Sequence, residues 1–398
     1  MALARDPTPM IDFDEVIDRR DTHSQKWDEL EKGYGVSPDD GIPLWVADMD
    51  FRAPPPVNEA LQQMVDHGIH GYYGDDSSFR TAMAGWMKRR HGWTIEPDWA
   101  LQTHGLVNAI AMVIQACSAP GEGVIIFSPV YHAFARIINA NGRRMVSSPL
   151  RVEDNRFHMD IEALEASLTG DERILLLCSP HNPGGRVWSA EELKEVAAFC
   201  ERKNIILVSD EVHHDLVMPG RSHHIMACVA PEICDRLVTL VATSKTFNIA
   251  GIETGSMLIS NPTLRRRVAK ARSAMSISNN RFGMIMAEAA YKGGDEWLDG
   301  LMTYLDGNRL VLNEGFAAIP GLSVMNLEAT YLAWVDFSGT GMEREQFTSR
   351  IRNVGLAPSA GQSFGPEGEL CMRFNIACRR ALLDEAMGRL AEAFSDLQ

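Results

Sequence analysis

Short apolar runs alternate with helical stretches through the middle of the chain. Several of these runs are apolar without interruption, a pattern typical of strands that are covered on both faces. We predict six strands, at Val124–Ser128, Arg144–Ser148, Ile174–Cys178, Ile205–Ser209, Leu237–Thr243 and Ser256–Ile259. Between two of them, Ser189-Ala190-Glu191-Glu192 has the form of a capping box and predicts a helix that runs to about Asn204. Strand, helix and strand at this spacing form a βαβ unit, so the sheet is predicted to be mainly parallel.

The C-terminal part has a different pattern, with strands predicted at Leu322–Asn326, Thr330–Phe337 and Glu369–Ala377 and a helix at Met342–Asn353. The final helix carries a core-facing stripe, spaced alternately by four and three, at Leu383, Met387, Leu390, Phe394 and Leu397. The pattern as a whole predicts an α/β fold. We expect a large domain over about residues 50–285 and a smaller α+β domain from residues 1–49 and 286–398.

The composition is that of an ordinary globular protein. The 398 residues are 45% hydrophobic and 23% charged, which excludes the disordered, collagen-like and disulfide-scaffold classes. The formal net charge is -15. This excess of acid argues against a nucleic-acid partner, because such binding needs clustered cations.

The cysteines, and the absence of long apolar stretches, indicate in which compartment of the cell the protein resides. The seven cysteines are an odd number without a C-x-x-C pair, and several lie in apolar runs, so we interpret them as reduced core thiols of a cytoplasmic protein. The N-terminal sequence MALARDPTPMIDFDE lacks the apolar stretch of a secretory signal. No run approaches about 18 uncharged apolar residues, so neither a membrane span nor a membrane partner is expected.

Polar side chains of three different kinds follow three of the predicted strands. Asn182 comes shortly after the third strand, Asp210 ends the fourth, and Lys245 follows the fifth. Ligands of doubly wound α/β folds bind at the carboxyl ends of the strands. We therefore expect an amide, a carboxylate and an amine to meet at one edge of the sheet.

Lys245 is the most informative of the three. The chain has eight lysines against thirty arginines, and most of the lysines lie in charged helical surroundings, whereas Lys245 follows an apolar strand. A lysine withdrawn from water has a lowered pKa and can form a Schiff base with an aldehyde. A carboxylate keeps a pyridine nitrogen protonated, and an amide can donate to a phenolic oxygen, so the three side chains together suit pyridoxal phosphate. Taken alone, Lys245 could equally be a surface lysine at the end of a strand.

The motifs around these residues resemble those of a known family. SPHNPGG, SDEVHHDL and TSKTFNIAG resemble the fold-type-I enzymes of the class I/II aminotransferase superfamily. LWVADMDF, the stretch Lys26–Gly35, HGYYG and MRFNIACRR are similar to its cystathionine β-lyase and cysteine C–S lyase branch, the MalY/PatB type. The resemblance runs along essentially the whole chain. It implies a large three-layer α/β domain with a smaller α+β domain, pyridoxal 5′-phosphate as cofactor, and a homodimer with shared active sites.

The resemblance also implies a role for each matching residue. Lys245 would form the Schiff base and take the proton from the substrate Cα, and Asp210 would pair with the pyridine nitrogen. Asn182 would hydrogen-bond the phenolic oxygen beside the substrate, with His213 close by, where many relatives have a tyrosine. Tyr131 would stack on the cofactor ring, although a buried tyrosine between strand and helix is also explained by packing.

The phosphate is expected to lie against neutral donors. Gly105-Leu106-Val107 precedes a helical run, and the free N–H groups at a helix start bind anions. Thr243 and Ser244 could add hydroxyl groups, and Tyr72 of HGYYG resembles a catalytic tyrosine that reaches the phosphate of the partner subunit. Many aminotransferases carry a phosphate-binding arginine where this chain has Glu253, which should turn away or pair with a cation. The lyase branch also lacks that arginine.

The substrate carboxylate needs a cation. Arg373 matches the arginine that holds this carboxylate in the family, because a guanidinium group can bind a carboxylate with two hydrogen bonds. The backbone of Val46 and Ala47 would close over the same group. No metal site is expected, because the adjacent pairs His213-His214 and His223-His224 do not converge on one ion from a regular element.

The reaction implied by the resemblance is β-elimination from cystathionine or another S-substituted cysteine. Transamination by the same site is an alternative, because both reactions begin with removal of the Cα proton and the shape of the pocket is not visible in the sequence. A third alternative is a regulatory protein-binding role with the cofactor bound, since such a role is attributed to some relatives in this branch.

Overall fold

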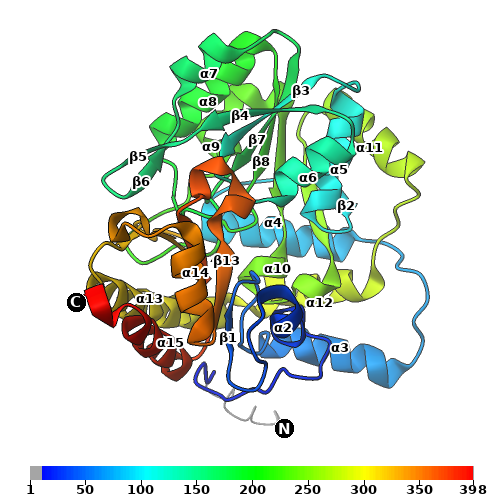
Figure 1. Ribbon diagram of the computed structural model, residues 1–398. Coiled ribbons are helices and arrows are strands. Elements are labelled where there is room, and N and C mark those ends of the chain that lie inside the picture. Colours follow the sequence, from blue (N-terminus) through cyan, green and yellow to red (C-terminus); the bar gives the residue numbers. More distant parts are fainter. Residues whose placement is uncertain (1–10, 398) are drawn as a thin grey trace.

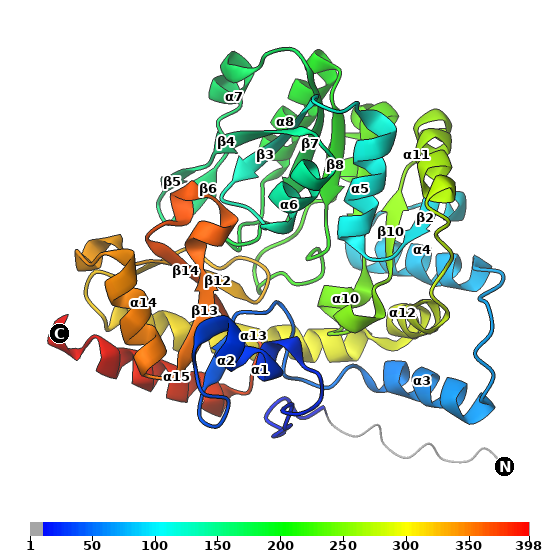
Figure 2. The ribbon, with the colours of Figure 1, turned by 45° about the vertical axis from the view of Figure 1, so that its right-hand side comes forward.

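The computed structural model describes residues 11–397, and it contains one large and one smaller sheet with helices packed around both (Figures 1 and 2). The large sheet has seven strands in the order β2-β10-β9-β8-β7-β3-β4. Their bounds are β2 (Ala100–Thr103), β3 (Gly123–Ser128), β4 (Arg144–Pro149), β7 (Glu172–Cys178), β8 (Ile206–Asp210), β9 (Leu237–Val241) and β10 (Gly255–Leu258). Only β10 runs antiparallel to its neighbours in this sheet, β2 and β9.

Helices cover both faces of the large sheet, which explains its uninterrupted apolar strands. In β7, Ile174 and Leu176 pack against one face and Leu175 and Leu177 against the other, and all four are buried. The first face is covered by α5 (Leu106–Cys117), α6 (Ala133–Ala140) and α11 (Pro262–Ala274). The second face is covered by α7 (Ile161–Ser167), α8 (Ala190–Lys203) and α9 (Met226–Val229). Figure 2 shows the sheet between these two layers.

The smaller sheet has five strands in the order β1-β13-β14-β12-β11 and lies toward the two ends of the chain. Its strands are β1 (Ile42–Leu44), β11 (Ser323–Val324), β12 (Leu332–Asp336), β13 (Leu356–Ala360) and β14 (Cys371–Asn375). Helices α13 (Asp295–Ala317), α14 (Arg344–Asn353) and α15 (Arg380–Ala393) accompany it, at the lower left of Figure 1. The remaining main helices are α1 (Gln25–Asp28), α2 (Leu30–Tyr34), α3 (Pro55–His67), α4 (Ser77–His91) and α12 (Arg281–Gly293). A separate two-stranded sheet pairs β5 (Arg151–Glu153) with β6 (Arg156–His158).

The predicted strands and helices are confirmed with small shifts of their ends. The capping box of α8 is present, because Ser189 and Glu192 accept each other's backbone N–H groups. The predicted strand Leu237–Thr243 is too long: β9 ends at Val241, and Thr243 begins the short helix α10 (Thr243–Thr246). The sequence analysis did not predict β1, β2, β5, β6 or β13. Of these, β1 and β13 each contain a proline, a residue that argues against a strand.

The large sheet spans residues 100–258 and the smaller one is formed from residues 42–44 and 323–375, while the exact domain boundaries remain a prediction.

None of the seven cysteines forms a disulfide, but Cys228 and Cys234 are exposed, so the expectation that all are core thiols was wrong. Both lie in short helical segments, α9 and the turn Pro231–Arg236, where apolar neighbours in the sequence do not ensure burial. The first ten residues, on which part of the signal-sequence argument depends, lie outside the described range. Within residues 11–397, no helix is long and apolar enough to span a membrane.

Candidate active site

The carboxyl ends of five strands meet at one edge of the large sheet. Strands β3, β7, β8 and β9 are parallel, and β2 shares their direction because β10 is antiparallel to both β9 and β2. The segments that leave these ends carry the predicted residues Gly105, Tyr131, Asn182, Asp210 and Lys245. The topology therefore places at one edge the side chains that the sequence analysis grouped together.

The Lys245 amine lies in a setting that lowers its pKa. Its Nζ donates a hydrogen bond to the Ala47 carbonyl oxygen at 2.7 Å. Withdrawal from water, aided by the positive charge of Arg373, lowers the pKa of Lys245 to about 8, although the carboxylates of Asp48 and Asp210 act in the opposite direction. A useful fraction of this amine is therefore unprotonated near neutral pH.

Asp210 is a buried carboxylate that forms no ion pair within residues 11–397. Its Oδ1 accepts a hydrogen bond from the Val212 N–H at 3.2 Å. Burial, aided by the charge of Glu211, raises the pKa of Asp210 to about 7. A cation placed against this carboxylate would restore its ionised form.

Arg373 is a buried guanidinium group in strand β14. Its Nη1 donates to the Asn182 side-chain oxygen at 3.1 Å, and its Nη2 donates to the Trp45 carbonyl and to the Ser359 hydroxyl. Its Nε has no hydrogen-bond partner, and in the described part of the chain no carboxylate forms an ion pair with it. Burial lowers the pKa of Arg373 to about 10. Because Arg373 comes from the smaller sheet and Asn182 from the larger one, the site lies where the two sheets meet.

The segment from Trp45 to Asp50 crosses this junction and is fixed by its carbonyl groups. Asn375 donates to the carbonyl groups of Val46 and Asp48, both at 2.6 Å. The Tyr331 hydroxyl donates to the same Ala47 carbonyl that accepts from Lys245, at 2.9 Å. The predicted residues Val46 and Ala47 therefore lie beside both Lys245 and Arg373.

The sequence analysis missed Tyr331 and Asn375, and it gave no role to Asn248. Asn248 holds the same segment from its other side, because its side chain bonds the Met49 backbone at both N–H and carbonyl and donates to the Phe51 carbonyl. Tyr331 and Asn375 lie more than 280 residues from the segment they contact. No local pattern in the sequence indicates contacts of that range.

The edge of the sheet also offers unused donors for an anion. Gly105 precedes α5 with a left-handed φ of 74°, and no side chain caps the N–H groups that follow it at Leu106 and Val107. A left-handed backbone of this kind favours glycine. The hydroxyl of Thr243 is buried without a hydrogen-bond partner, and Ser244 is the next residue of the same turn. These groups suit a phosphate, as predicted from the sequence.

His213 and Tyr131 complete the described site. Burial, and then the positive charge of Lys245, lowers the pKa of His213 to about 3, so its imidazole ring is neutral. Its Nδ1 is buried without a hydrogen-bond partner. Burial and the nearby Asp210 carboxylate raise the pKa of Tyr131, which keeps its hydroxyl protonated.

Two residues discussed in the sequence analysis lie away from this group. Tyr72 is 97% exposed, so it contributes nothing to the site of its own chain. Glu253 is exposed at the end of a short turn, which fits the expectation that it turns away.

The residues present fit pyridoxal phosphate. A partly neutral amine, a buried carboxylate without a cation, and unused backbone and hydroxyl donors correspond to the aldehyde, the ring nitrogen and the phosphate of that cofactor. The buried Arg373 has no carboxylate partner in the described chain, so its positive charge is not neutralised by an ion pair there.

A family model, related sequences and a solved structure all match this chain over nearly its whole length. The family model for aminotransferase class I and II matches residues 39–390. The chain is 37% identical over 397 residues to cystathionine beta-lyase PatB of Bacillus subtilis, with 97% of this chain and 100% of that protein covered. It is 32% identical over 391 residues to protein MalY of Escherichia coli, with 96% and 99% covered. The structure of cystalysin from Treponema denticola, which contains a pyridoxal 5′-phosphate cofactor, matches with a TM-score of 0.93 at 34% identity, covering 98% of this chain and 100% of that one.

Proposed function

This chain belongs to the class I and II aminotransferase family, and from that premise we propose that it is a pyridoxal-phosphate-dependent carbon–sulfur β-lyase of the fold-type-I class. Its reaction is the α,β-elimination of cystathionine or another S-substituted L-cysteine to pyruvate, ammonia and a thiol. The choice of a lyase depends on the full-length similarity to cystathionine beta-lyase PatB. The geometry around Lys245 and Arg373 supports it.

Arg373 binds the α-carboxylate of the amino acid. Its guanidinium group is already oriented by Asn182, Ser359 and the Trp45 carbonyl, so little side-chain freedom remains to be lost on binding. Burial strengthens the attraction between this cation and a carboxylate. The carboxylate then lies near Lys245, whose amine bonds the adjacent segment at Ala47.

Lys245 removes the proton from the substrate Cα. With a pKa of about 8, roughly a tenth of this amine is neutral at pH 7, compared with less than about one part in a thousand for a lysine of ordinary pKa. Bound pyridoxal phosphate supplies an electron-poor ring that accepts the electron pair left at Cα. Asp210 maintains that capacity, because its buried carboxylate favours a protonated ring nitrogen.

The bond from Cβ to sulfur then breaks, and the electron pair of that bond leaves on the sulfur. A thiolate leaves readily, because the pKa of its conjugate acid is about 8.5. His213, which is neutral in its buried position, adds no positive charge beside the Lys245 amine. The site thus lowers the pKa of the base and holds the substrate carboxylate, and the Lys245 amine carries the proton taken from Cα while the leaving group departs.

Incubation of the holoenzyme with cystathionine in the absence of any 2-oxo acid tests this function. We expect pyruvate and ammonia in equal amounts, and we expect Lys245→Ala to abolish both. If instead no pyruvate forms and an amino group passes to an added 2-oxo acid, the chain is an aminotransferase and the lyase proposal is wrong.

We further propose that two copies of the chain share their active sites through Tyr72. Tyr72 is 97% exposed and lies in a segment with other exposed apolar side chains, including Val65 at 56% and Ile69 at 68%. His70 packs on Phe282 at 5.3 Å between ring centroids, which extends this surface onto α12. A surface of this kind suits a second copy of the chain, whose phosphate site Tyr72 would enter.

A cytoplasmic location is proposed on the basis of thiol chemistry. All seven cysteines are free, and two of them are exposed. Free exposed thiols are typical of a reducing compartment.

A further inference from the structure

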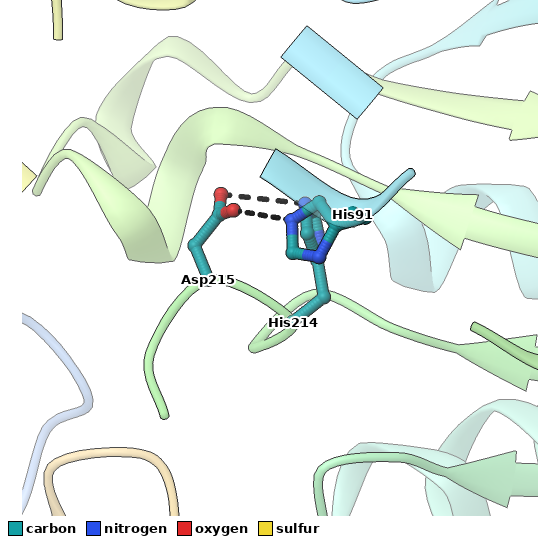
Figure 3. A group of neighbouring side chains, drawn as sticks. All are labelled: His91, His214 and Asp215. Carbon is teal, nitrogen blue, oxygen red and sulfur yellow. Dashed lines mark hydrogen bonds and ion pairs between the residues drawn. The ribbon is translucent and has the colours of Figure 1, made fainter. Parts of the chain in front are cut away.

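A second group of titratable side chains lies beyond the substrate site, at the end of α4. His91 comes from that helix, and His214 and Asp215 come from the segment that follows β8 (Figure 3). The Nε2 atom of His91 lies 2.7 Å from Asp215 Oδ1, and the Nε2 atom of His214 lies 3.3 Å from Asp215 Oδ2. The three side chains are 9%, 1% and 2% exposed, respectively.

The hydrogen bonding of His214 determines which of its nitrogens carries the proton. Its Nδ1 bonds the backbone carbonyl of Glu211, and a carbonyl oxygen only accepts, so Nδ1 is the donor. In the neutral ring, Nε2 therefore carries a lone pair. That nitrogen lies 3.3 Å from Oδ2 of Asp215, and within residues 11–397 it has no hydrogen-bond partner although it is buried. Two acceptors thus lie close together, away from water, with no donor between them.

We propose that this group binds a divalent transition-metal ion of the Zn²⁺ class, with His91 Nε2, His214 Nε2 and one Asp215 oxygen as ligands. Ligand atoms about 2.1 Å from a tetrahedral Zn²⁺ are about 3.4 Å apart. The separation of His214 Nε2 and Asp215 Oδ2 is 3.3 Å, close to that value. A cation at this position removes the conflict between the two acceptors.

The groups around the three ligands are those of a supported metal site. A histidine that binds a metal commonly donates its other ring N–H to a backbone carbonyl, as His214 does to Glu211. The Asp215 carboxylate is oriented by the Trp86 indole N–H and by the Thr246 hydroxyl at 2.9 Å. A carboxylate has about four lone-pair positions, so these bonds leave room for a metal ion.

Binding requires His91 to move. His91 now lies within hydrogen-bond distance of Asp215, at 2.7 Å, and must withdraw by somewhat more than half an ångström for a metal ion to enter. Its proton then resides on Nδ1, which leaves Nε2 free as a ligand. His91 is the most exposed of the three and lies at the last residue of its helix, where such a movement costs least.

The ion would tie the end of α4 to the turn that carries the catalytic lysine. Thr246, which bonds Asp215, is the residue next to Lys245 in α10. The site shares no ligand with the substrate site, so the proposal does not rest on the proposed lyase reaction. It also differs from the sites considered in the sequence, because it takes one member of the pair His213-His214 and joins it to His91, more than a hundred residues away in the chain.

Direct measurement of bound metal tests the proposal. The holoenzyme is treated with a chelator and dialysed against Zn²⁺ alone, and the zinc retained per chain is measured by atomic emission. The same is done for His91→Gln, for His214→Gln and for the control His224→Gln, which changes a neighbouring histidine outside the group. We expect the wild type and the control to retain one more zinc ion per chain than the other two variants.

Two further readouts keep the test decisive. Co²⁺ in the same site should give visible ligand-field bands at longer wavelength than the cofactor absorption, and His91→Gln should abolish them. Zn²⁺ should raise the Tm of the wild type but not that of His91→Gln, because a ligand that binds only the folded chain stabilises it. If His214→Gln does not fold, His91→Gln decides alone. Equal zinc contents in the wild type and His91→Gln, or no retained zinc in either, would overturn the proposal and leave a proton as the cation between His214 and Asp215.

Discussion

Burial gives Lys245, Asp210 and Arg373 acid–base properties that their residue types do not have in water. Burial disfavours the charged form in each case, so it lowers the pKa of the lysine and of the arginine and raises that of the aspartate. These side chains come from the two sheets that meet at the site. The pKa shifts therefore arise at this junction and not from the overall acidity of the chain. The chemistry of the site therefore depends on how these few residues are enclosed.

Lys245 should titrate well below an ordinary lysine in the cofactor-free protein. NMR of the ¹³C-methylated chain should show one lysine with a pKa near 8, and this signal should be missing in Lys245→Arg. Asp210→Asn should lower the pKa of this lysine further, because the negative charge of Asp210 favours the protonated amine. A Lys245 signal that titrates with the other lysines, near 10.4, would show that the amine is not withdrawn from water.

Arg373→Lys should weaken substrate binding more than it changes cofactor binding. Lysine keeps the charge but cannot make the two-point contact with a carboxylate, so we expect KM for cystathionine to rise about tenfold or more. The absorption spectrum of the bound cofactor should stay that of the wild type. Arg136→Lys, a substitution of an exposed arginine near Tyr131, serves as the control and should leave KM unchanged. An unchanged KM in Arg373→Lys would remove Arg373 from the carboxylate site.

At the scale of elements, the N-terminal helices and the segment from Trp45 to Asp50 form one unit. Lys26 in α1 is 1% exposed and pairs with Asp50 at 2.7 Å. The same carboxylate accepts from Arg19 at 2.7 Å and from the Trp27 indole at 2.9 Å. The motifs KWDELEKG and LWVADMDF thus contact each other, and the second motif carries the backbone that contacts Lys245. This unit connects the N-terminal region to the active site.

Asp50→Asn should destabilise the fold in a manner that depends on pH. Burial alone would raise the pKa of Asp50, but the charges of Lys26 and Arg19 outweigh it and lower the pKa. A lowered pKa in the folded state contributes stability above the unfolded pKa of about 3.9, and this contribution is lost as the pH falls toward the folded value. At neutral pH we expect a loss of about 3 to 5 kcal/mol, because the buried Lys26 keeps only the more distant carboxylate of Asp48, at 3.9 Å, and Arg19 also loses Asp50.

Urea unfolding of Asp50→Asn and of the wild type measures this difference. The gap between the two proteins should narrow as the pH falls below about 4, where the wild-type carboxylate also begins to be protonated in the unfolded chain. The exposed Asp39→Asn, in the same N-terminal region, is the matched control and should be nearly neutral. A gap that stays constant down to low pH would show that the charge of Asp50 is not the source of the stability.

At the scale of the whole molecule, the site lies at the junction of two sheets, and one proposed contributor points away from it. Tyr72 belongs to the segment between α3 and α4, which runs along the outside of the chain in both ribbon views. If Tyr72 serves a second copy, each site is built from two chains. The function of the protein then depends on its assembly.

Mixing two inactive variants should restore activity if the sites are shared. Lys245→Ala and Tyr72→Ala, unfolded together and refolded with cofactor, should form mixed dimers in which one site has both an intact lysine and an intact tyrosine. Random assembly would restore about a quarter of the wild-type sites. The two variants assayed separately provide the baseline, and sedimentation checks that dimers form. Activity that never exceeds this baseline would place Tyr72 outside the partner's site.

The sequence by itself determined six of the seven strands of the large sheet and the residue types at their ends, whereas β2 was not predicted. Uninterrupted apolar runs and the capping box at Ser189 report short-range preferences, and these were sufficient to predict β3, β7 and β8 and to bring Asn182, Asp210 and Lys245 to one edge. The motifs around them also led to the correct family and cofactor.

Only the tertiary structure decided how distant residues meet. It showed that Arg373 has no carboxylate partner in the described chain, that Tyr331 and Lys245 share the Ala47 carbonyl, and that His91 lies against Asp215. Such contacts depend on how whole layers pack, and a local pattern of polar and apolar residues carries no information about which distant side chain will be adjacent. For the same reason, the properties that burial confers on the site could be stated only once the two sheets were in place.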